Sequence, residues 1–303
     1  MKITRSPLFY VGDKYKLMGQ LKKLFPETIN KFIEPFVGGG SVFLNTKANE
    51  YLVNDIDTNV INLHKTLSKF DIDTLLNELS KIVHNYGLSF SFKGITVPDN
   101  LKRQYIKTYY AKYNKLAYEK LRKDFNNDKN NILYLYILLI YGFNRIIRFN
   151  SKGNFNLPVG NVDFNINVYN ALKNYISFMQ KNKIHFENND YINFINKIHF
   201  ENNDYVYLDP PYLISNSEYN KFWNISNEIA LYKLLDELNL KNIKFGITNL
   251  IHHKGQTNEI LKNWSQKYKI FNINSNYISF NDNTIKTDSK EIFVTNYNGV
   301  FYG

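Results

Sequence analysis

The chain contains no cysteine among its 303 residues. Disulfide bonds and thiolate metal sites are therefore excluded, and we expect a protein of the reducing cytoplasm. The N-terminal segment MKITRSPLFYVGDKYK lacks the apolar core of a secretory signal peptide. The longest apolar run, residues 132–143, is shorter than the roughly 20 residues that a bilayer span requires. These absences together favour a cytoplasmic protein without a membrane partner.

Acidic residues are in deficit, because 38 Lys and Arg stand against 27 Asp and Glu, which gives a formal net charge of +11. An excess of this size suggests a polyanionic partner such as nucleic acid, although charge alone does not decide it. The chain is long enough for one large domain, or for one domain with an insertion.

Strand and helix patterns alternate near both ends of the chain. The apolar spacing predicts a helix over residues 14–25, and a further helix can begin at Ser41. Strands are predicted over 31–36, 51–56, 205–208, 243–248 and 291–296, and a helix over 228–238. This alternation predicts an α/β fold with a largely parallel sheet, in which ligands bind at the carboxyl ends of the strands.

Charged helical stretches dominate from about residue 67 onward. An aromatic stripe predicts the buried face of a helix there, with the lysines mostly off it: Tyr105, Tyr109, Tyr110, Tyr113 and Leu116. Such lysines are also plausible phosphate contacts. Residues 143–160 have little periodicity and predict an ordered loop or hairpin. The simplest organisation is an α/β domain in two pieces, separated by a helical insertion.

A ten-residue sequence, NKIHFENNDY, occurs twice, at residues 182–191 and 196–205. Solenoid folds need at least three repeats, so two copies do not indicate a repeat array. We interpret the pair as a local duplication.

The tetrapeptide Asp209-Pro210-Pro211-Tyr212 directly follows a predicted strand. The two prolines have a fixed φ and no N–H, so they form a stiff turn whose carbonyls are open to hydrogen bonds. Asp209 adds a carboxylate, and Tyr212 adds a flat aromatic surface. Such a group suits an aryl amine whose N–H bonds point at Asp209 and at the Pro210 carbonyl. A base reaches this pocket only when flipped out of the duplex; an ordinary strand-end turn is the alternative for the motif alone.

Glycines follow the first predicted strand, in residues 34–40 (EPFVGGG). Glycines at this place let a ligand approach the backbone and expose N–H groups at a helix N-terminus. The dinucleotide motif GxGxxG and a P-loop lysine are both missing. Asp55, at the end of the next strand, is placed to accept hydrogen bonds from ribose hydroxyls. A tight turn and a helix cap would explain each feature separately, but together they favour an adenosine-type cofactor.

Six collinear motifs resemble the Dam-type, or D12 class, DNA adenine-N6 methyltransferases over nearly the whole chain. They are PLFYVGDK (7–14), FIEPFVGGGSVF (32–43), VND (53–55), GFNRIIRFNSKGNFNLPVG (142–160), DPPY (209–212) and EIFVTNY (291–297). The resemblance implies a class I methyltransferase fold, with a mixed, mostly parallel sheet and helices on both faces. It also implies a mainly helical target-recognition domain at 67–168, inserted between catalytic parts at 1–66 and 169–303.

The resemblance implies S-adenosyl-L-methionine as the methyl donor, S-adenosyl-L-homocysteine as the product, and no metal. Tyr10 and Lys14 would contact the cofactor near its methionine end, and Asp55 would lie on the ribose. Residues of the glycine segment would line the cofactor pocket: Glu34, Phe36, Gly38, Gly39 and Gly40. The catalytic residues would be those of the tetrapeptide: Asp209, Pro210, Pro211 and Tyr212. The Asp209 carboxylate would lie between cofactor and target amine, and Tyr212 would stack on the flipped adenine.

In this family an Asp followed by an aromatic residue holds the adenine of the cofactor. The duplication offers two such pairs, and we expect Asp190 and Tyr191, because Asp204 would start the same strand that leads to Asp209. One departure from the family pattern is Asp13, which stands at a glycine position. Its added bulk and negative charge would weaken cofactor binding. The duplicated segment could also displace the strand before residue 209.

Residues 143–150 resemble the recognition hairpin that the family uses for the DNA sequence GATC. The resemblance implies that the aromatic ring of Phe143 wedges into the duplex. It places base-edge contacts at four positions: Ile146, Arg148, Asn150 and Pro158. Arginine reads guanine and asparagine reads adenine in the major groove, which agrees with this assignment. An ion pair is the alternative role for Arg148. The remaining expected DNA contacts are Asn144, Arg145 and Lys152. Of these, Arg145 and Lys152 are expected to touch phosphate.

We therefore expect methyl transfer to adenine N6 in duplex DNA by base flipping, at GATC or the longer GATATC. Cytosine-C5 methylation is excluded because the chain has no cysteine, and the Asp of DPPY argues against cytosine-N4. Enzymes that methylate RNA or a protein glutamine typically have an Asn-Pro-Pro-Tyr motif, which is missing here. A catalytically silent DNA-binding relative is the alternative that Asp13 and the duplication favour. We expect a cognate restriction endonuclease as a functional partner, and a bacterial or phage protein of the cytoplasm, at the nucleoid.

Overall fold

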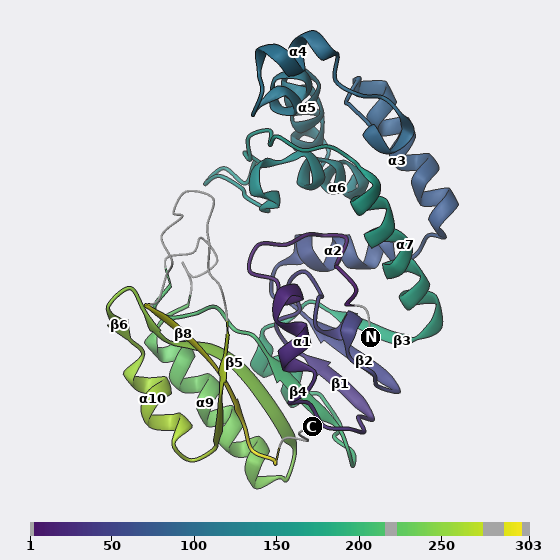
Figure 1. Ribbon diagram of the computed structural model, residues 1–303. Coiled ribbons are helices and arrows are strands. Elements are labelled where there is room, and N and C mark those ends of the chain that lie inside the picture. The colour runs from purple at the N-terminus through teal and green to yellow at the C-terminus, as the bar shows by residue number, and fades with distance from the viewer. Residues whose placement is uncertain (1–2, 216–222, 275–287, 299–303) are drawn as a thin grey trace. The chain divides into compact units, whose positions relative to one another are not determined.

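The computed structural model describes residues 3–215, 223–274 and 288–298 (Figure 1). Contacts divide the chain into two compact units. The helical unit comprises Met1–Tyr15, Gly38–Leu44 and Asp57–Asn182, and the sheet unit comprises Lys16–Val37, Asn45–Ile56 and Lys183–Gly303. This division follows contacts and not function, so the functional domain boundaries expected from the sequence stay a prediction.

The strands that the structure describes lie in the sheet unit and form one sheet in the order β3-β2-β1-β4-β5-β8-β7, with β6 paired to β5. They are β1 (Lys31–Glu34), β2 (Glu50–Asn54), β3 (Lys183–Glu187), β4 (Tyr205–Leu208), β5 (Lys244–His253), β6 (Gln256–Thr257), β7 (Lys269–Ile273) and β8 (Ser289–Thr295). The strands from β3 to β5 pair in parallel, whereas β8 is antiparallel to both of its neighbours. The predicted strands are therefore confirmed as strands, and the largest difference is that β5 continues to His253, five residues beyond its predicted end.

Both faces of the sheet are covered within the sheet unit. On one face, Ile33, Val206 and Ile247 join a buried cluster with α8 (Tyr191–Asn196), α9 (Ile225–Leu240) and α10 (Glu259–Ser265). On the other face the ring of Phe25, which follows α1 (Met18–Leu21), lies 5.3 Å from the ring of Tyr205. Residues of β4 are buried on both faces, as parallel strands between two layers require. The sheet and its two covering layers confirm the expected α/β, class I methyltransferase fold.

Two predicted helices are shorter than the sequence pattern suggested. Residues 14–25 form only a 3-10 turn, Tyr15–Leu17, and the four residues of α1. Gly19 lowers the helix propensity of this segment, and the following residues turn so that Phe25 reaches the sheet. The helix expected from Ser41 is a single 3-10 turn, Phe43–Asn45.

The helical unit contains α2 (Thr58–Leu67), α3 (Ile72–Tyr86), α4 (Asp99–Gln104), α5 (Tyr109–Asn127), α6 (Ile132–Tyr141) and α7 (Ile166–Lys181). The long apolar run is α6, whose residues from Leu135 to Tyr141 are all fully buried. A helix that is apolar on every side belongs inside a protein core. Among the residues described by the structure, none of the helices combines the length and the apolar character that crossing a membrane would need.

The predicted aromatic core stripe of α5 is wrong. This helix buries Asn114, Tyr118, Leu121 and Phe125, whereas Leu116 is 80% exposed. The two stripes lie on neighbouring faces, and tyrosine, with its polar hydroxyl, suits a half-exposed position as well as a buried one. The tyrosines of the predicted stripe are instead half-buried at the surface of α5 and the segment before it.

Residues 143–160 form the ordered hairpin that the sequence predicted. Isolated bridges join Gly142 to Val159 and Phe149 to Phe155. The main chain of Phe143 donates to the carbonyl of Pro158 at 2.9 Å, which closes the base of the hairpin. The predicted recognition segment is therefore a defined structural element of the helical unit.

Candidate active site

The polar residues of the candidate site lie where the parallel strands end. Glu34 is the last residue of β1, Asp55 follows β2, and Asp209 follows β4. Because β2, β1 and β4 are adjacent and parallel, their carboxyl ends share one edge of the sheet. Ligands of open α/β sheets bind at this edge. The three acidic residues predicted from separate motifs thus come from one edge of the sheet unit.

A hydrogen-bond network holds the carboxylate of Asp209. Its Oδ1 accepts hydrogen bonds from the Thr248 hydroxyl and from the Tyr212 hydroxyl, both at 3.0 Å. The Tyr212 oxygen also lies 2.9 Å from Oε1 of Glu291, which is fully buried in β8. A phenol has one proton, so the hydroxyl donates to one carboxylate at a time. Tyr212 is therefore oriented by its hydroxyl as well as by packing.

Residues next to this network keep it polar and fixed. Pro210 is buried, and Pro211 and Tyr212 are half-buried. The Tyr207 hydroxyl lies 2.9 Å from that of Thr248. Burial, and after it the charge of Asp209, raises the pKa of Tyr207 well above its ordinary value, so this hydroxyl stays neutral. Sequence reasoning missed Thr248 and Glu291, although Glu291 begins the quoted motif EIFVTNY.

Asn54, which the sequence also did not single out, joins the two segments expected around the cofactor. Its side chain is fully buried and donates to the carbonyls of Pro35 at 3.0 Å and of Asn189 at 2.9 Å. It also accepts from the Asn189 main chain at 2.8 Å. One amide side chain thereby positions the residues before Asp190 against those that lead to Phe36. Asp55 itself is half-buried.

Three aromatic rings gather at this edge of the sheet. Phe36 lies 5.1 Å from Tyr191 and 5.8 Å from Trp223, between ring centroids. Phe36 and Tyr191 were predicted as cofactor residues, whereas Trp223 was missed. Burial raises the pKa of Tyr191 to about 12, so its hydroxyl stays protonated. Asp190 is the N-cap of α8, and its Oδ1 accepts from the main chain of Ile192 at 2.9 Å.

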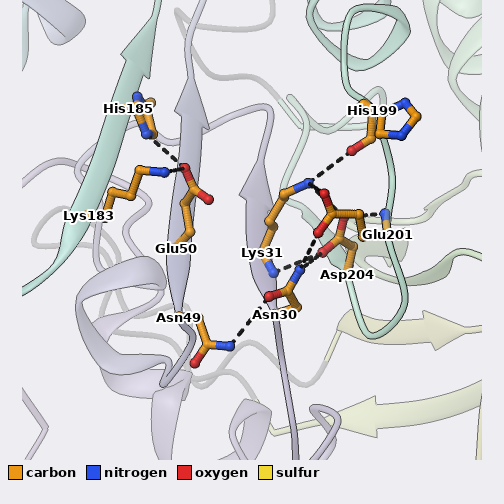
Figure 2. A network of polar contacts seen from close by, with 9 residues as sticks. All are labelled: Asn30, Lys31, Asn49, Glu50, Lys183, His185, His199, Glu201 and Asp204. Atoms are coloured by element: carbon orange, nitrogen blue, oxygen red, sulfur yellow. Dashed lines mark hydrogen bonds and ion pairs between the residues drawn. The ribbon is translucent and has the colours of Figure 1, made fainter.

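Asp204, the candidate that the sequence argument set aside, lies at the opposite edge of the sheet (Figure 2). Its side chain is fully buried, and Oδ1 accepts from the Lys31 main chain at 3.0 Å and from the Asn30 side chain at 2.9 Å. These residues begin β1 or lie directly before it, at the amino end of the strand. Asp204 thus stabilises the starts of β1 and β4, and the role of Asp190 in holding the cofactor stays a prediction.

In the helical unit, the glycine loop packs against the predicted residue Tyr10. A Cβ at Gly39 would lie 2.7 Å from the Cβ of Tyr10, so only glycine allows this contact. Gly40 has a positive φ of 78°, and a Cβ there would overlap the ring of Phe43. At Gly38 a Cβ would make only an ordinary contact, 3.7 Å from the Tyr10 ring, and the positive φ of 46° is what favours glycine there. Two of the three glycines are therefore explained by packing within this unit.

His64, missed by sequence reasoning, positions the carbonyl of Gly38. Burial lowers the pKa of His64 to about 4, so the ring is neutral. Its Nε2 lies 2.9 Å from the Gly38 carbonyl, which can only accept, so Nε2 is the protonated nitrogen. Nδ1 then accepts from the Tyr175 hydroxyl at 2.9 Å. The tautomer follows from the two partners.

The N-terminal segment accommodates both Lys14 and the unexpected Asp13. Lys14 is only 6% exposed, and its Nζ lies 3.5 Å from the carbonyl of Gly12. Burial raises the pKa of Asp13, and the charge of Arg5 opposes this shift. Oδ1 of Asp13 accepts from the main chain of Tyr15 at 3.2 Å. Asp13 lies outside the positive-φ region, so the replacement of a glycine there does not strain the backbone.

Most predicted DNA-contact residues of the hairpin are exposed, while Arg145, Ile146 and Arg148 are half-buried. The exposed ones are Phe143, Asn144, Asn150, Lys152 and Pro158. Arg148 donates through Nε to the side chain of Asn156 and through Nη2 to its carbonyl, both at 2.9 Å. A guanidinium has five donors, so this anchor leaves capacity for a base edge.

Arg145 packs against the N-terminal segment of the helical unit. Its guanidinium carbon lies 4.1 Å from the ring centroid of Phe9, and burial lowers its pKa to about 10. A cation–π contact of this kind holds the arginine in place. The phosphate contact expected of Arg145 stays a prediction.

Comparison with known proteins places the chain beside a family of enzymes. The family described as D12 class N6 adenine-specific DNA methyltransferase matches residues 10–278. The chain is 33% identical to the type II methyltransferase M.FokI of Planomicrobium okeanokoites over 301 residues, 97% of this chain and 43% of that protein. It is 33% identical to the modification methylase StsI of Streptococcus sanguinis over 309 residues, 98% and 43% of the two chains.

A shorter similarity reaches the DNA adenine methylase of Haemophilus influenzae. The identity is 34% over 164 residues, which cover 52% of this chain and 48% of that protein. Nearly the whole chain thus spans less than half the length of the first two relatives, and about half of it matches about half of the third.

Proposed function

Because the chain belongs to the D12 class of N6 adenine-specific DNA methyltransferases, we propose that it transfers a methyl group from S-adenosylmethionine to the N6 amine of adenine in duplex DNA. The observation that supports this most directly is the anchored carboxylate of Asp209. It follows a central parallel strand, at the edge where such sheets bind ligands, next to the aromatic ring of Tyr212. This arrangement suits an aryl amine.

The sheet unit offers residues that fit the cofactor. Phe36 and Tyr191 provide flat apolar surfaces for a purine, and Asp55 and Asp190 provide carboxylates for ribose hydroxyls and an adenine amine. When bound, the cofactor supplies an electrophilic methyl group on a sulfonium. The roles of Tyr10, Lys14, Glu34 and the glycines 38–40 in holding it rest on the resemblance and are part of the proposal.

The residues of the chain act on the target amine by holding it. Thr248 and Tyr212 fix the carboxylate of Asp209, which then accepts one N–H of the amine. The carbonyl of Pro210 accepts the other. Holding both hydrogens directs the nitrogen lone pair away from the ring and toward the methyl group. Orientation and preorganised hydrogen bonds of this kind account for catalysis, and the proposal includes no metal ion and no covalent enzyme intermediate.

We further propose that the hairpin at 143–160 reads the DNA and that the target adenine is flipped out of the duplex. Exposure of Phe143 and of Asn150 supports a surface that contacts DNA. GATC is the site that the hairpin resemblance favours. Since two relatives are named as type II and modification enzymes, we also propose a modification role. A cognate restriction endonuclease would be its functional partner, in the cytoplasm at the nucleoid.

Incorporation of tritium from labelled cofactor into duplex DNA tests the proposal. We expect label in a duplex that contains GATC, and a loss of at least about 100-fold in turnover for Asp209→Asn, as for removal of an anchored polar group at a reacting centre. Asp99→Asn, at an exposed position of α4, is the matched control and should methylate normally. DNA binding without label transfer would instead support the catalytically silent alternative.

Sequencing of methylated bases in a host without adenine methylation identifies the base and the site together. N6-methyladenine confined to GATC would support the whole proposal. N6-methyladenine in another sequence would overturn only the assigned site.

A further inference from the structure

Glu228 is a fully buried carboxylate in the first turn of α9, outside the predicted machinery. It accepts hydrogen bonds from the Trp223 indole at 2.6 Å and the Tyr232 hydroxyl at 2.5 Å. Two amides, those of Asn249 at 3.1 Å and Asn258 at 2.8 Å, donate to the same carboxylate. Burial of a carboxylate is costly, and four donors offset that cost. The carboxylate of Glu228 is therefore a rigid anchor for the four side chains that donate to it.

Among these donors, Trp223 faces the candidate site. Its indole N–H points to Glu228, while its ring lies edge-on to Phe36, at 82° and 5.8 Å. The ring of Tyr191 is 5.9 Å away. Trp223 is half-buried, so part of its surface remains accessible. The anchor thus sets the orientation of a ring beside the two aromatic residues proposed for the cofactor.

The three rings come from connections that follow different parallel strands. Phe36 follows β1, Tyr191 follows β3, and Trp223 follows β4. In the strand order, β1 lies between β2 and β4, where the direction of strand addition reverses. Ligands of this fold class bind outside such a reversal point. A cluster of flat rings there suits a nucleobase.

We propose that Trp223 forms one wall of the pocket for the adenine base of the cofactor, and that Glu228 is the positioning residue that holds this wall. The inference rests on the proposed function and deepens it. None of the six sequence motifs includes Trp223 or Glu228. Trp264, the second of the two tryptophans in the chain, offers a matched comparison, because its indole donates to Asp236 at 2.9 Å and its ring is 6% exposed.

Tryptophan fluorescence tests the proposal without measuring activity. Trp264→Phe leaves Trp223 as the single tryptophan, and Trp223→Phe leaves Trp264. Each variant is titrated with S-adenosylhomocysteine in the absence of DNA, and binding is measured in parallel by calorimetry. We expect the emission of Trp223 to change with the calorimetric midpoint, because a stacked base alters the indole environment. The emission of Trp264 should stay constant.

Affinity provides the second measurement. We expect Trp223→Ala to raise the Kd for S-adenosylhomocysteine roughly tenfold, which lies within the range that the stacking of a base on a ring contributes. Trp223→Phe should raise it less, because the ring remains while the anchor to Glu228 is lost. Glu228→Gln should act like Trp223→Phe. If Glu228→Gln fails to fold, the fluorescence of Trp264→Phe still tests the wall, and Trp223→Phe, which lacks the indole N–H, still tests the contact to Glu228.

Two outcomes separate the inference from the proposed function. If calorimetry shows binding to Trp264→Phe while Trp223 emission stays constant, the wall is elsewhere and the inference is overturned, with the proposed function intact. If the wild-type protein binds no S-adenosylhomocysteine, the proposed function fails, and the inference fails with it.

Discussion

The two copies of NKIHFENNDY have the same ten residues and different structures. In the first copy, residues 183–187 form the edge strand β3, and Tyr191 begins α8. In the second copy, Asn196 ends α8, the chain turns, and Tyr205 begins β4. The same ten-residue sequence therefore adopts two different conformations in this protein. The difference teaches that neighbouring strands and tertiary contacts, and not local propensity, select the conformation of this segment.

The copies have a similar burial pattern, and Tyr191 and Tyr205 are both buried, but the pattern belongs to different local structures. Residues of β3 alternate between exposed and half-buried, as expected of an edge strand. In the second copy Ile198 and Phe200 pack against the buried cluster of the sheet unit, and Tyr205 is fully buried. The same apolar side chains thus follow one face of a strand in one place and fill a turn in the other.

The polar residues of the two copies also differ in their partners (Figure 2). Lys183 and His185 of the first copy contact the carboxylate of Glu50 at 2.8 and 2.9 Å. In the second copy, the His199 carbonyl and the Glu201 carboxylate both contact the Nζ of Lys31 at 3.0 Å. His199 contributes its main chain where His185 contributes its ring. The equivalent histidines are thus a side-chain partner in one copy and a backbone partner in the other.

The largest expected effect separates the two aspartates, Asp204 and Asp190. Asp204→Asn replaces a buried acceptor by an amide, which cannot accept from the main chains of both Lys31 and Glu201. We expect the free energy of unfolding to fall by about 3 kcal/mol, the usual cost of losing a buried charged partner. Urea denaturation monitored by circular dichroism measures this loss.

The equivalent change in the first copy is the matched control. Asp190 caps α8 from a half-buried position. Asparagine is also a good N-cap, so Asp190→Asn should cost roughly 0.5 kcal/mol or less. Equal losses for the two variants would contradict the assignment of a structural role to the second copy and not to the first.

A smaller effect is expected on cofactor affinity, and here the substitution at Asp190 should matter more than the one at Asp204. Asp190→Ala should raise the Kd for S-adenosylhomocysteine about tenfold, because one hydrogen bond to a charged group is worth about 1.5 kcal/mol. Asp204→Asn, measured at a temperature where it is folded, should bind as the wild type does. Calorimetric titration checks both. If Asp204→Asn proves the weaker binder, the proposed roles of the copies are exchanged.

Much of the fold was predictable because its signals are local. Short apolar runs predicted the strands, and the motifs that follow β1, β2 and β4 predicted which strand ends bear polar residues. The spacing to Asp209 predicted that Asp204 starts the strand β4, whereas the cofactor role of Asp190 stays a prediction. Each of these inferences depends on residues that are close in the sequence.

The residues that were missed depend on contacts distant in the sequence. Glu228 and Trp223 are five residues apart, but the two amides that complete the anchor lie on or beyond β5. His64 is recognisable only once its partners, Gly38 and Tyr175, are known. Tyrosines misled the prediction for α5 because an amphipathic ring fits a half-exposed face. Patterns within one element cannot reveal which of its faces another element covers.

The smallest expected effect concerns the lysines at the second position of the repeat, Lys183 and Lys197. The hydrogen bond from Lys183, with His185 as a weaker contributor, lowers the pKa of Glu50. A lowered pKa means that the ion pair stabilises the fold above the ordinary Glu value of 4.5, and that this contribution is lost as the pH falls through the folded-state pKa. Lys183→Ala should therefore destabilise the protein at pH 7, by less than about 1 kcal/mol because the pair is partly exposed.

At a pH below the folded-state pKa of Glu50, wild type and Lys183→Ala should unfold at the same urea concentration. Lys197→Ala is the matched control, since Lys197 is the exposed C-cap residue of α8, and its effect should be near zero and independent of pH. A pH-independent loss for Lys183→Ala would assign its contribution to the packing of its aliphatic stem and not to charge. The two lysines would then differ only in what their stems contact, and the electrostatic part of the comparison between the copies would rest on Lys31 alone.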